Sequence, residues 1–413
     1  MKSNKLFFLL LVIILSLFTL TGCWNRKELG DLGIVGAVSI DESGEKLRLT
    51  YEMVTAISKD SKGDQEPVSY LQSEGQTVFD ANRNATLKSA NKLFWPHINM
   101  IYFSPKFAQR GLFTFIDFFN RDHEARRFPN IAVTKMENAY EILPLTGTKA
   151  DIPSRYVEKL FENYSSNGKS VSIKLSDFLK AYYAEGIEPV AGLIQVAKKV
   201  DTKEESSEGG SDKESKDDKK NENLVPSIEG LAVFKEDQLI GFFNGEEARG
   251  YNFLTNELKS CIIVSPALNS EGEPVGDSEG KNGMEVITSS CDKKVEVKDD
   301  QYYATVKVEI NGMLDSASGT KDVSCITSIK TIEESTSEIV KNEIGRAIQK
   351  AKEYHSDIFG FGQALHISDP KKWKQIKGSW NEEFVSLNVN VMVKTNIQRA
   401  GVENEQLSFK ESR

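Results

Sequence analysis

The sequence is poor in the residues from which metal and redox sites are usually built. Only four cysteines and four histidines occur in 413 residues. Four cysteines are too few for a disulfide-dense scaffold in a chain of this length. No CxxC pair is present, and no two histidines stand at the spacing of metal ligands. Neither a structural zinc site nor a thioredoxin-like redox pair is therefore indicated.

Catalytic motifs are also missing. His123-Glu124 continues as HEARR, so the second histidine of the zinc-protease pattern HExxH is absent. No GxSxG elbow, no P-loop and no GxGxxG after a strand occurs, and Gly360–Gly362 is a lone GxG that predicts a tight turn. Glu246-Glu247 is one of several acidic pairs, but adjacent residues on a helix do not face each other. We predict that the chain is not an enzyme and uses no metal or other cofactor.

The sequence also lacks an excess of positive charge. Acidic residues outnumber basic ones by 61 to 52, which gives a formal net charge of −9. A nucleic-acid binder needs a dense basic face to displace counterions from phosphates, so no nucleic-acid partner is expected. Apolar residues make up 39% of the chain and charged residues 27%, which is typical of folded globular proteins. At this length the chain is expected to form two or three domains.

One long apolar run stands out, and it lies near the first residue. Leu6–Leu20 follows Lys2 and Lys5, and it is shorter than the roughly 20 residues of a stable membrane span. A charged start followed by a short apolar core is the layout of a secretory signal. Leu20–Cys23 (LTGC) then reads as a lipobox, at which bacterial lipoproteins are cut and carry diacylglycerol on the cysteine sulfur. We predict a signal peptide over 1–22 and lipidation of Cys23; an uncleaved signal anchor is the alternative.

Cleavage would make the chain more acidic. Loss of Lys2 and Lys5 takes the formal net charge from −9 to −11. Anionic lipid head groups repel such a chain, so acyl chains rather than basic patches are expected to hold it to a membrane. Of the remaining cysteines, Cys261 and Cys291 adjoin strand-like runs and could bridge adjacent strands. Separate buried thiols are the equal alternative.

Strand-like and helical segments alternate in the first half of the chain. Gly33–Asp41 and Lys46–Val54 read as a hairpin. Ser104-Pro105 is a strong helix start and opens a predicted helix over Lys106–Asn120. A strand over Asn130–Thr134 follows. This alternation favours helices packed on a sheet.

The second half begins after a solvated segment. Residues 200–223 contain nine acids, five lysines and, apart from Val200, no apolar residue. The clearest helix further on is Glu333–Tyr354, where Val340, Ile344 and Ala347 share one stripe and Glu343 lies off it. Phe384–Lys394 alternates like a closing strand. The last third is therefore read as an α+β unit.

Together these segments predict an α+β fold of three domains, each a mixed or antiparallel β-sheet flanked by α-helices, after a cleaved lipoprotein signal peptide. The predicted parts are the signal peptide 1–22, an N-terminal α/β domain 23–199, an acidic disordered insert 200–223, a middle β-rich domain 224–325 and a C-terminal α+β domain 326–413.

Four clusters of arginine, aromatic and acidic residues remain without a catalytic interpretation. Arginine and aromatic residues are the favoured anchors of protein interfaces, so we predict partner contacts there. Core wedges, helix caps and solvated ion pairs are the alternative for each cluster. The candidates are Trp95, His97, Arg121, Arg126, Glu247, Arg249, Asp357, Phe361 and Trp373.

In order and spacing, these clusters resemble the Ger(x)C lipoproteins, the C subunits of the nutrient germinant receptors of spore-forming bacteria. The resemblance covers essentially the whole chain after the signal peptide, and the acidic insert 200–223 is its chief departure. Its first half runs from Cys23-Trp24 through Glu28-Leu29, the strand 33–41, Gly75–Thr77, Trp95–His97, Ala108–Leu112 and Arg121–Arg126. Its second half comprises Glu247–Gly250, Asp357–Gly362, Trp373 and Trp380.

The resemblance implies a non-enzymatic subunit in the spore's inner membrane, exposed on the outer face and tethered through diacylglyceryl-Cys23. It implies two polytopic partner subunits, one similar to amino-acid transporters and expected to bind the germinant, the other implicated in ion release. It also implies three domains, each a sheet flanked by helices. Small-molecule binding is then not the primary task of the chain.

Two other classes compete with this interpretation. A substrate-binding lipoprotein of a transporter usually has two similar α/β lobes, whereas the two halves here differ in pattern. A lipoprotein cell-wall hydrolase needs paired catalytic acids or zinc ligands that the sequence does not offer.

Overall fold

The computed structural model describes residues 7–8, 32–54, 68–121, 128–147, 152–199, 224–269, 273, 280–299, 301–316 and 326–399. Cys23, Arg126, the insert 200–223 and most of the predicted signal peptide lie outside these residues. Among the described residues, no helix is long and apolar enough to cross a membrane.

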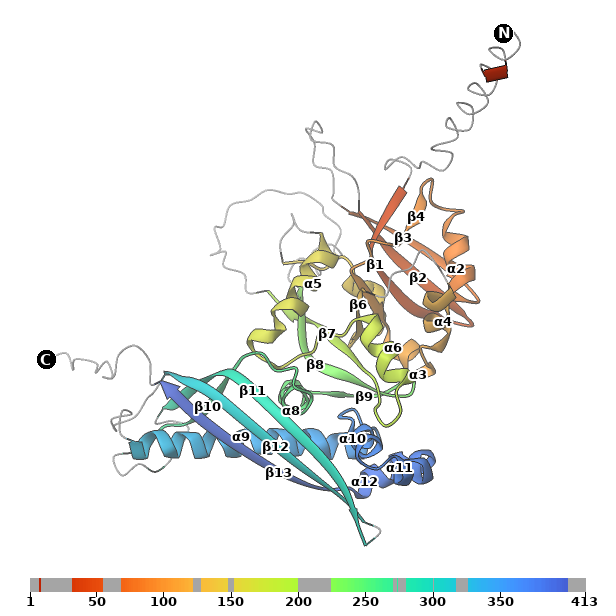
Figure 1. Ribbon diagram of the computed structural model, residues 1–413. Helices are drawn as coiled ribbons and strands as arrows, with labels where there is room; N and C mark the ends of the chain where they lie inside the picture. The colour runs from red at the N-terminus through yellow and green to blue at the C-terminus, as the bar shows by residue number, and fades with distance from the viewer. Residues whose placement is uncertain are drawn as a thin grey trace, which may run out of the picture.

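Two β-sheets organise the described chain (Figure 1). The first has the order β3-β2-β1-β5-β6-β7-β8-β9, with β4 added beside β1. Its inner strands β1, β5, β6 and β7 run parallel, and antiparallel strands flank them. The strands are β1 (Leu32–Ser43), β2 (Lys46–Val54), β3 (Val68–Gly75), β4 (Lys92–Phe94), β5 (Met100–Phe103), β6 (Asn130–Thr134), β7 (Val190–Lys198), β8 (Leu224–Lys235) and β9 (Gln238–Phe243).

The predicted hairpin at the start of this sheet is confirmed. β1 and β2 pair up to Ser43 and Lys46, which leaves a two-residue turn. Gly44 occupies the turn with a φ of 63°, a conformation that glycine adopts without steric cost.

Helices cover both faces of the first sheet. They are α2 (Val78–Ala85), α3 (Pro105–Arg110), α4 (Phe113–Arg121), α5 (Pro153–Asn163) and α6 (Leu175–Tyr183), with short 3₁₀ turns at Ala139–Ile142 and Tyr164–Ser166. On β5, Ile101 and Phe103 face the core under α2, α3, α4 and α6, while Met100 and Tyr102 face the core under α5. This alternation is the two-residue period of a strand that is buried on both faces.

The predicted helix over Lys106–Asn120 is two helices. Ser104 caps α3 as expected, because its hydroxyl accepts the N–H of Phe107. The helix nevertheless ends at Arg110, since Gly111 has a φ of 117°. The next residues bind the distant β8–β9 turn: the N–H of Leu112 donates to the carbonyl of Asp237 at 2.9 Å, and a new helix follows.

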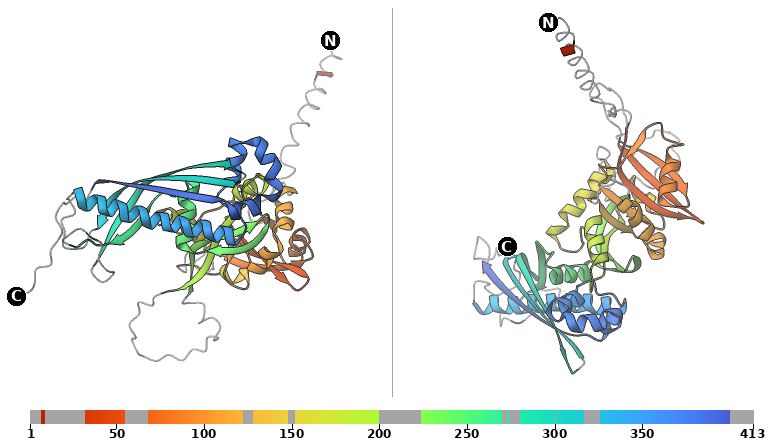
Figure 2. Two further views of the ribbon diagram at one scale, coloured as in Figure 1. Left: turned by 90° about the horizontal axis from the view of Figure 1, so that it is seen from below. Right: turned by 45° about the vertical axis from the view of Figure 1, so that its right-hand side comes forward.

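The second sheet has the order β10-β11-β12-β13 and carries its own helices (Figures 1 and 2). Its strands are β10 (Cys261–Pro266), β11 (Lys281–Lys298), β12 (Gln301–Ser316) and β13 (Asn388–Arg399). The helices are α8 (Gly245–Thr255), α9 (Ile326–Glu353), α10 (Phe361–Ser368), α11 (Pro370–Ile376) and α12 (Trp380–Ser386), with a 3₁₀ turn at Lys377–Ser379. The long helix α9 packs Val340, Ile344 and Ala347 into the core of this sheet, as its predicted stripe requires.

The α+β class is confirmed, and the sheets add a detail that sequence patterns did not supply. β8 and β9, which were expected in the middle domain 224–325, pair with β7 and complete the first sheet. β10, β11 and β12 from the same range belong to the second sheet, together with β13 from the range 326–413. The division into three domains stays a prediction.

A buried carboxylate connects α5 to the first sheet. Glu52 on β2 is fully buried and accepts hydrogen bonds from the backbone N–H and the hydroxyl of Ser154 in the first turn of α5. Burial raises the pKa of Glu52 from its usual 4.5 to about 7, although the Ser154 donors oppose this change. The folded protein therefore binds a proton here more tightly than the unfolded chain does.

This raised pKa predicts that stability falls as pH rises. The contribution of Glu52 is fully present below pH 4.5 and is lost as pH rises through about 7. The Glu52→Gln variant cannot ionise at this position, so its free energy of unfolding should not fall for this reason. Relative to the wild type, its free energy of unfolding should therefore rise by up to about 3 kcal/mol between pH 4.5 and pH 8. Urea unfolding at both pH values measures the difference.

The matched control for this experiment is Glu162→Gln, at an exposed glutamate on the outer side of α5. Its free energy of unfolding should follow the wild type at both pH values. An equal pH dependence of the wild type and Glu52→Gln would contradict the assignment.

Candidate functional site

The structure describes the side chains of seven of the nine predicted partner-contact residues. Arg126 lies outside the described residues, and Arg121 is described only as the last residue of α4. Of the seven, His97 is exposed and Glu247 is partly exposed. The other five are buried in the chain itself: Trp95, Arg249, Asp357, Phe361 and Trp373.

Trp95 belongs to the aromatic core under α2 and α4. Its ring meets Tyr51 edge-on, with centroids 5.6 Å apart, and it lies against Phe118 and Phe119 at 5.6 and 6.1 Å. Only 3% of the residue is exposed, so Trp95 does not offer its ring to a partner. The indole is a core wedge, and the neighbouring His97 is the surface residue of this cluster.

Asp357 shapes the turn between α9 and α10. One carboxylate oxygen, Oδ1, accepts the backbone N–H groups of Phe359, Gly360 and Phe361 at 3.2, 2.9 and 3.2 Å. The other oxygen, Oδ2, accepts the N–H of Gly362 at 2.7 Å and the indole N–H of Trp380 at 2.9 Å. Burial raises the pKa of Asp357, and these donors oppose that rise by stabilising the charged form.

The lone GxG is thereby explained as the tight turn that the sequence predicts. Gly360 has a φ of 75°, and a Cβ on Gly362 would lie 2.5 Å from Nε1 of Trp380. Both glycines are therefore needed for the conformation and close packing of this turn. Residues 356–363 are called the Asp357 loop below.

The Asp357 loop joins the two sheets. The N–H of Glu188, just before β7, donates to the carbonyl of Asp357 at 2.9 Å, and the N–H of Gln363 donates to the carbonyl of Gly186 at 2.9 Å. The hydroxyl of Ser356 donates to the carbonyl of Phe234 on β8 at 2.7 Å. Three hydrogen bonds therefore run from this one loop to the first sheet and the segment that enters it.

Trp373 extends the same junction. Its indole N–H donates to Glu185 at 2.8 Å, and its ring lies 5.6 Å from that of Trp380. Lys377 also binds Glu185, with 2.8 Å between Nζ and Oε1. Phe361 is fully buried and packs against the rings of Phe359 and Phe384. The predicted contact residues of this cluster therefore hold the two halves of the chain together.

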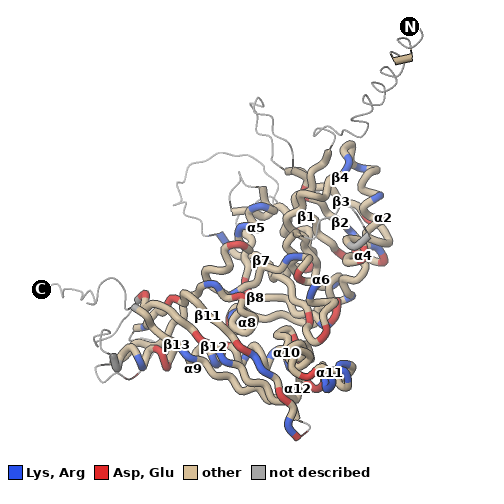
Figure 3. Tube along the Cα trace, viewed as in Figure 1, with Lys and Arg blue, Asp and Glu red and all other residues tan. Residues whose placement is uncertain are grey.

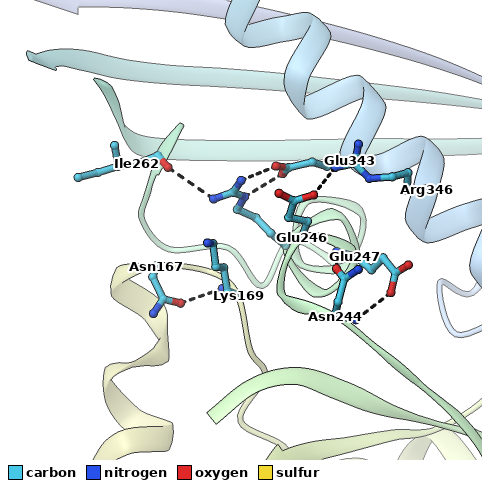
Figure 4. A network of polar contacts seen from close by, with 9 residues as sticks. Asn167, Lys169, Asn244, Glu246, Glu247, Ile262, Glu343 and Arg346 are labelled. Atoms are coloured by element: carbon cyan, nitrogen blue, oxygen red, sulfur yellow. Dashed lines mark hydrogen bonds and ion pairs between the residues drawn. The ribbon is translucent and has the colours of Figure 1, made fainter. Parts of the chain in front are cut away.

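The cluster around Glu247 connects α8 to α9 (Figure 4). Arg249 forms a two-pronged ion pair with Glu343, in which Nε donates to Oε2 at 2.8 Å and Nη2 contacts Oε1. Both side chains are almost fully buried. Glu247 forms a capping box with Asn244 at the start of α8, and the exposed pair Glu246–Arg346 lies beside it with 2.7 Å between the charged atoms.

Glu343 was missed by the sequence reading, which placed it off the apolar stripe of the long helix. The residue is only 2% exposed and faces α8. Its spacing carried a signal, because Glu343 lies three residues after Val340 and four before Ala347 and thus shares their face. Gly250 permits the close approach of the helices, since a Cβ there would lie 2.6 Å from the carbonyl oxygen of Glu343.

The bridge considered between Cys261 and Cys291 is not formed. Both residues are free thiols. They lie on adjacent strands, but Cys261 stands opposite Val286 and Cys291 opposite Val308, so they are five residues out of register. Burial raises the pKa of Cys261 to about 12 and that of Cys291 to about 11, which keeps both protonated and unreactive at neutral pH.

A cavity of about 450 Å³ lies beside the Asp357 loop, between α6 and α8. Lys293 on β11 lines it and donates from Nζ to the carbonyl of Phe359 at 2.5 Å. The NH₂ group of Asn252, also in its lining, donates to the carbonyls of Gly168 and Ser170, whereas Oδ1 of this side chain is buried without a hydrogen-bond partner in the described chain. Within the described ranges, no three His, Cys, Asp or Glu side chains come together as metal ligands.

The fold is similar to that of a solved structure. The crystal structure of the GerBC protein is similar over 87% of this chain and 96% of that chain, with a TM-score of 0.50 and 15% sequence identity. At this identity the likeness concerns the fold.

Family models assign the class. The model described as "Spore germination protein N-terminal domain" matches residues 25–196, and the model described as "Spore germination B3/ GerAC like, C-terminal" matches residues 229–401. The chain belongs to the Ger(x)C family of spore germination proteins.

Individual relatives agree with this assignment. Spore germination protein KC of Bacillus subtilis (strain 168) is 27% identical over 97% of both chains. Spore germination protein B3 of the same organism is 21% identical over 93% of this chain and 94% of its own.

The buried ion pair predicts an asymmetric response to mutation. Arg249→Met or Glu343→Met alone leaves one charge buried without its partner, which should lower the free energy of unfolding by about 3–5 kcal/mol. The double variant Arg249→Met/Glu343→Met removes both charges and should recover most of that loss. Urea unfolding of the four proteins measures the coupling.

The exposed pair Glu246–Arg346 provides the control on the same two helices. Its single variants Glu246→Gln and Arg346→Gln should each change stability by less than about 1 kcal/mol. Single losses at Arg249 and Glu343 that simply add in the double variant would contradict the role given to this pair.

Proposed function

We propose that this chain is the non-catalytic C subunit of a spore nutrient germinant receptor, lipid-anchored through Cys23 and assembled with two polytopic membrane subunits. The observation that carries the proposal is the match of two successive family domains over residues 25–196 and 229–401. The named relatives are spore germination proteins that align over nearly their full length. The site of action is the outer face of the spore's inner membrane.

The interior of the chain supports a structural rather than a catalytic role. The buried polar clusters described above are used for capping, turn formation and helix pairing, which accounts for Glu247, Arg249 and Asp357 without a substrate. The two sheets differ in strand number and order, unlike the paired lobes of a substrate-binding lipoprotein. A scaffold that positions membrane subunits fits these features best.

Anchoring is assigned to the LTGC sequence at 20–23. A diacylglyceryl cysteine supplies two acyl chains, and two lipid signals are needed for stable anchoring. The negative net charge would otherwise keep the chain away from an anionic membrane surface.

A gene deletion with complementation tests this function. In a strain without a redundant receptor, deletion should abolish germination on the nutrients that this receptor senses and leave germination by dodecylamine largely intact. The wild-type gene should restore the nutrient response, whereas Cys23→Ala should lose most of it together with membrane retention of the protein.

Cys291→Ala provides the matched control, because it removes a thiol that carries no lipid. It should behave like the wild type in germination and in membrane fractionation. Normal nutrient germination of the deletion strain would contradict the receptor role. Full membrane retention and activity of Cys23→Ala would contradict the anchoring.

A further inference from the structure

One segment of this acidic chain contains basic residues and no acidic ones. Residues 81–116 contain five lysines and arginines and no aspartate or glutamate, although the whole chain carries a net charge of −9. This is a long stretch without an acid in a sequence where acidic residues outnumber basic ones. The structure shows how these bases are distributed.

Two of the five bases lie beside Glu42. Lys106 and Arg110 on α3 both contact Glu42, at 3.3 and 3.5 Å. The other three, Arg83, Lys88 and Lys92, lie where α2 runs into β4, and residues 83–92 are called the α2–β4 tip here. Figure 3 shows blue segments, which mark lysine or arginine, near the labels α2 and β4.

The α2–β4 tip presents an apolar side chain among these bases. Leu87 is 84% exposed, the largest exposed fraction of the large apolar residues in the described chain. Its position is fixed by the backbone, because the N–H of Leu87 donates to Asn84 at 3.1 Å and that of Lys88 donates to Ala85 at 3.0 Å. Leu87 is thus held out from the surface by an ordered turn.

The α2–β4 tip also lies beside the point where the chain arrives from its predicted anchor. β4 pairs in parallel with the start of β1, and Lys92 stands opposite Leu32, the first described residue of that strand. Leu32 lies nine positions after Cys23, a distance of at most about 30 Å when the chain is fully extended. Figure 1 shows β4 and the start of β1 at one end of the described chain and the second sheet at the opposite end.

We propose that the α2–β4 tip rests on the surface of an anionic lipid bilayer. Leu87 would enter the boundary between head groups and acyl chains, and Arg83 and Lys88 would face lipid phosphates. The proposal rests on the lipid anchor of the proposed function and adds the orientation of the chain on the membrane. The acyl chains supply retention, and the tip selects which end of an acidic protein approaches the bilayer.

The physical reason is the local sign of charge. Each lysine or arginine near an anionic surface favours the bound state by about fivefold, and acidic residues are repelled over a Debye length. The nearest acid before the tip in the sequence, Asp80, accepts hydrogen bonds from the N–H of Gln76 and from the side-chain amide of Asn84, which belongs to the tip. The second sheet would then project away from the bilayer, toward the spore exterior.

A depth-sensitive fluorophore tests the orientation on the lipidated full-length protein. An NBD label is attached at Ala90→Cys on the tip or at Gln375→Cys on α11, two exposed positions at opposite ends. Both proteins carry Cys291→Ser and Cys325→Ser, so that buried Cys261 is the only other unlipidated thiol. They are reconstituted into vesicles of phosphatidylcholine and phosphatidylglycerol (3:1) with a doxyl-labelled lipid as quencher. The label at 90 should be quenched and blue-shifted, and the label at 375 should be neither.

Matched variants identify the groups responsible. Arg83→Gln/Lys88→Gln should lower the docked-to-undocked ratio about 25-fold and abolish most of the quenching at position 90. Leu87→Gln should also lower the docked-to-undocked ratio. Lys371→Gln/Lys374→Gln on α11 removes the same charge at the far end, and Ile367→Gln removes an apolar residue that is 77% exposed; both should leave the quenching unchanged.

The outcomes separate this proposal from the function it rests on. Protein that floats with the vesicles but shows no quenching at position 90 would retain the anchor and overturn the orientation. Protein that fails to float would overturn the anchor and the orientation together. Shielding of position 90 only after polytopic membrane proteins are added would assign the tip to a protein partner and overturn the lipid proposal.

Discussion

The carboxylate of Asp357 is fully buried and accepts five hydrogen bonds, and it shapes the loop whose polar contacts join the two sheets beside the apolar core that they share. Four of the donors are successive backbone N–H groups of residues 359–362, and the fifth is the indole of Trp380. Through these bonds one side chain fixes the turn after α9, the start of α10 and the position of α12. The same turn supplies the hydrogen bonds to Gly186, Glu188 and Phe234 in the other half of the chain.

Burial of charge is costly, and the structure meets that cost by saturating each charge with partners. Asp357 has its five donors, Arg249 and Glu343 neutralise each other, and Glu52 is held by Ser154 with a pKa near neutrality. Arginine, tryptophan and acidic residues are therefore used to orient the interior of this protein. Other surfaces are left for protein partners, such as the exposed residues around His97.

Sequence patterns correctly predicted those features that depend on interactions between residues close together in the chain. The β1–β2 hairpin, the Ser104 cap and the apolar stripe of α9 follow from spacing and from side-chain hydrogen bonding within a few residues. The break at Gly111 did not follow, because the residue that holds it in place, Asp237, is more than a hundred positions away. The pairing of the β8–β9 hairpin with β7 could not be predicted either, because it joins segments that are distant in the sequence.

The candidate site shows the same limit. Arginine and tryptophan are enriched at interfaces and are also used in well-packed interiors, so composition could not tell whether Arg249 and Trp373 face a partner or the interior of the chain itself. Only the position of Glu343, three and four residues from core positions of α9, pointed to a buried pair. The order of the clusters along the sequence indicated the family. Most of their residues, however, are buried and make contacts inside the chain.

Hydrogen exchange on Asp357→Asn tests most directly whether this carboxylate holds the two halves together. Asparagine keeps Oδ1 as an acceptor but turns an NH₂ group toward the N–H of Gly362 and the indole of Trp380, where only an acceptor fits. The account predicts exchange about 10- to 100-fold faster in residues 359–368 and 184–190, with β1 and β2 unchanged. Unchanged protection in 359–362, or an equal increase across both sheets, would contradict it.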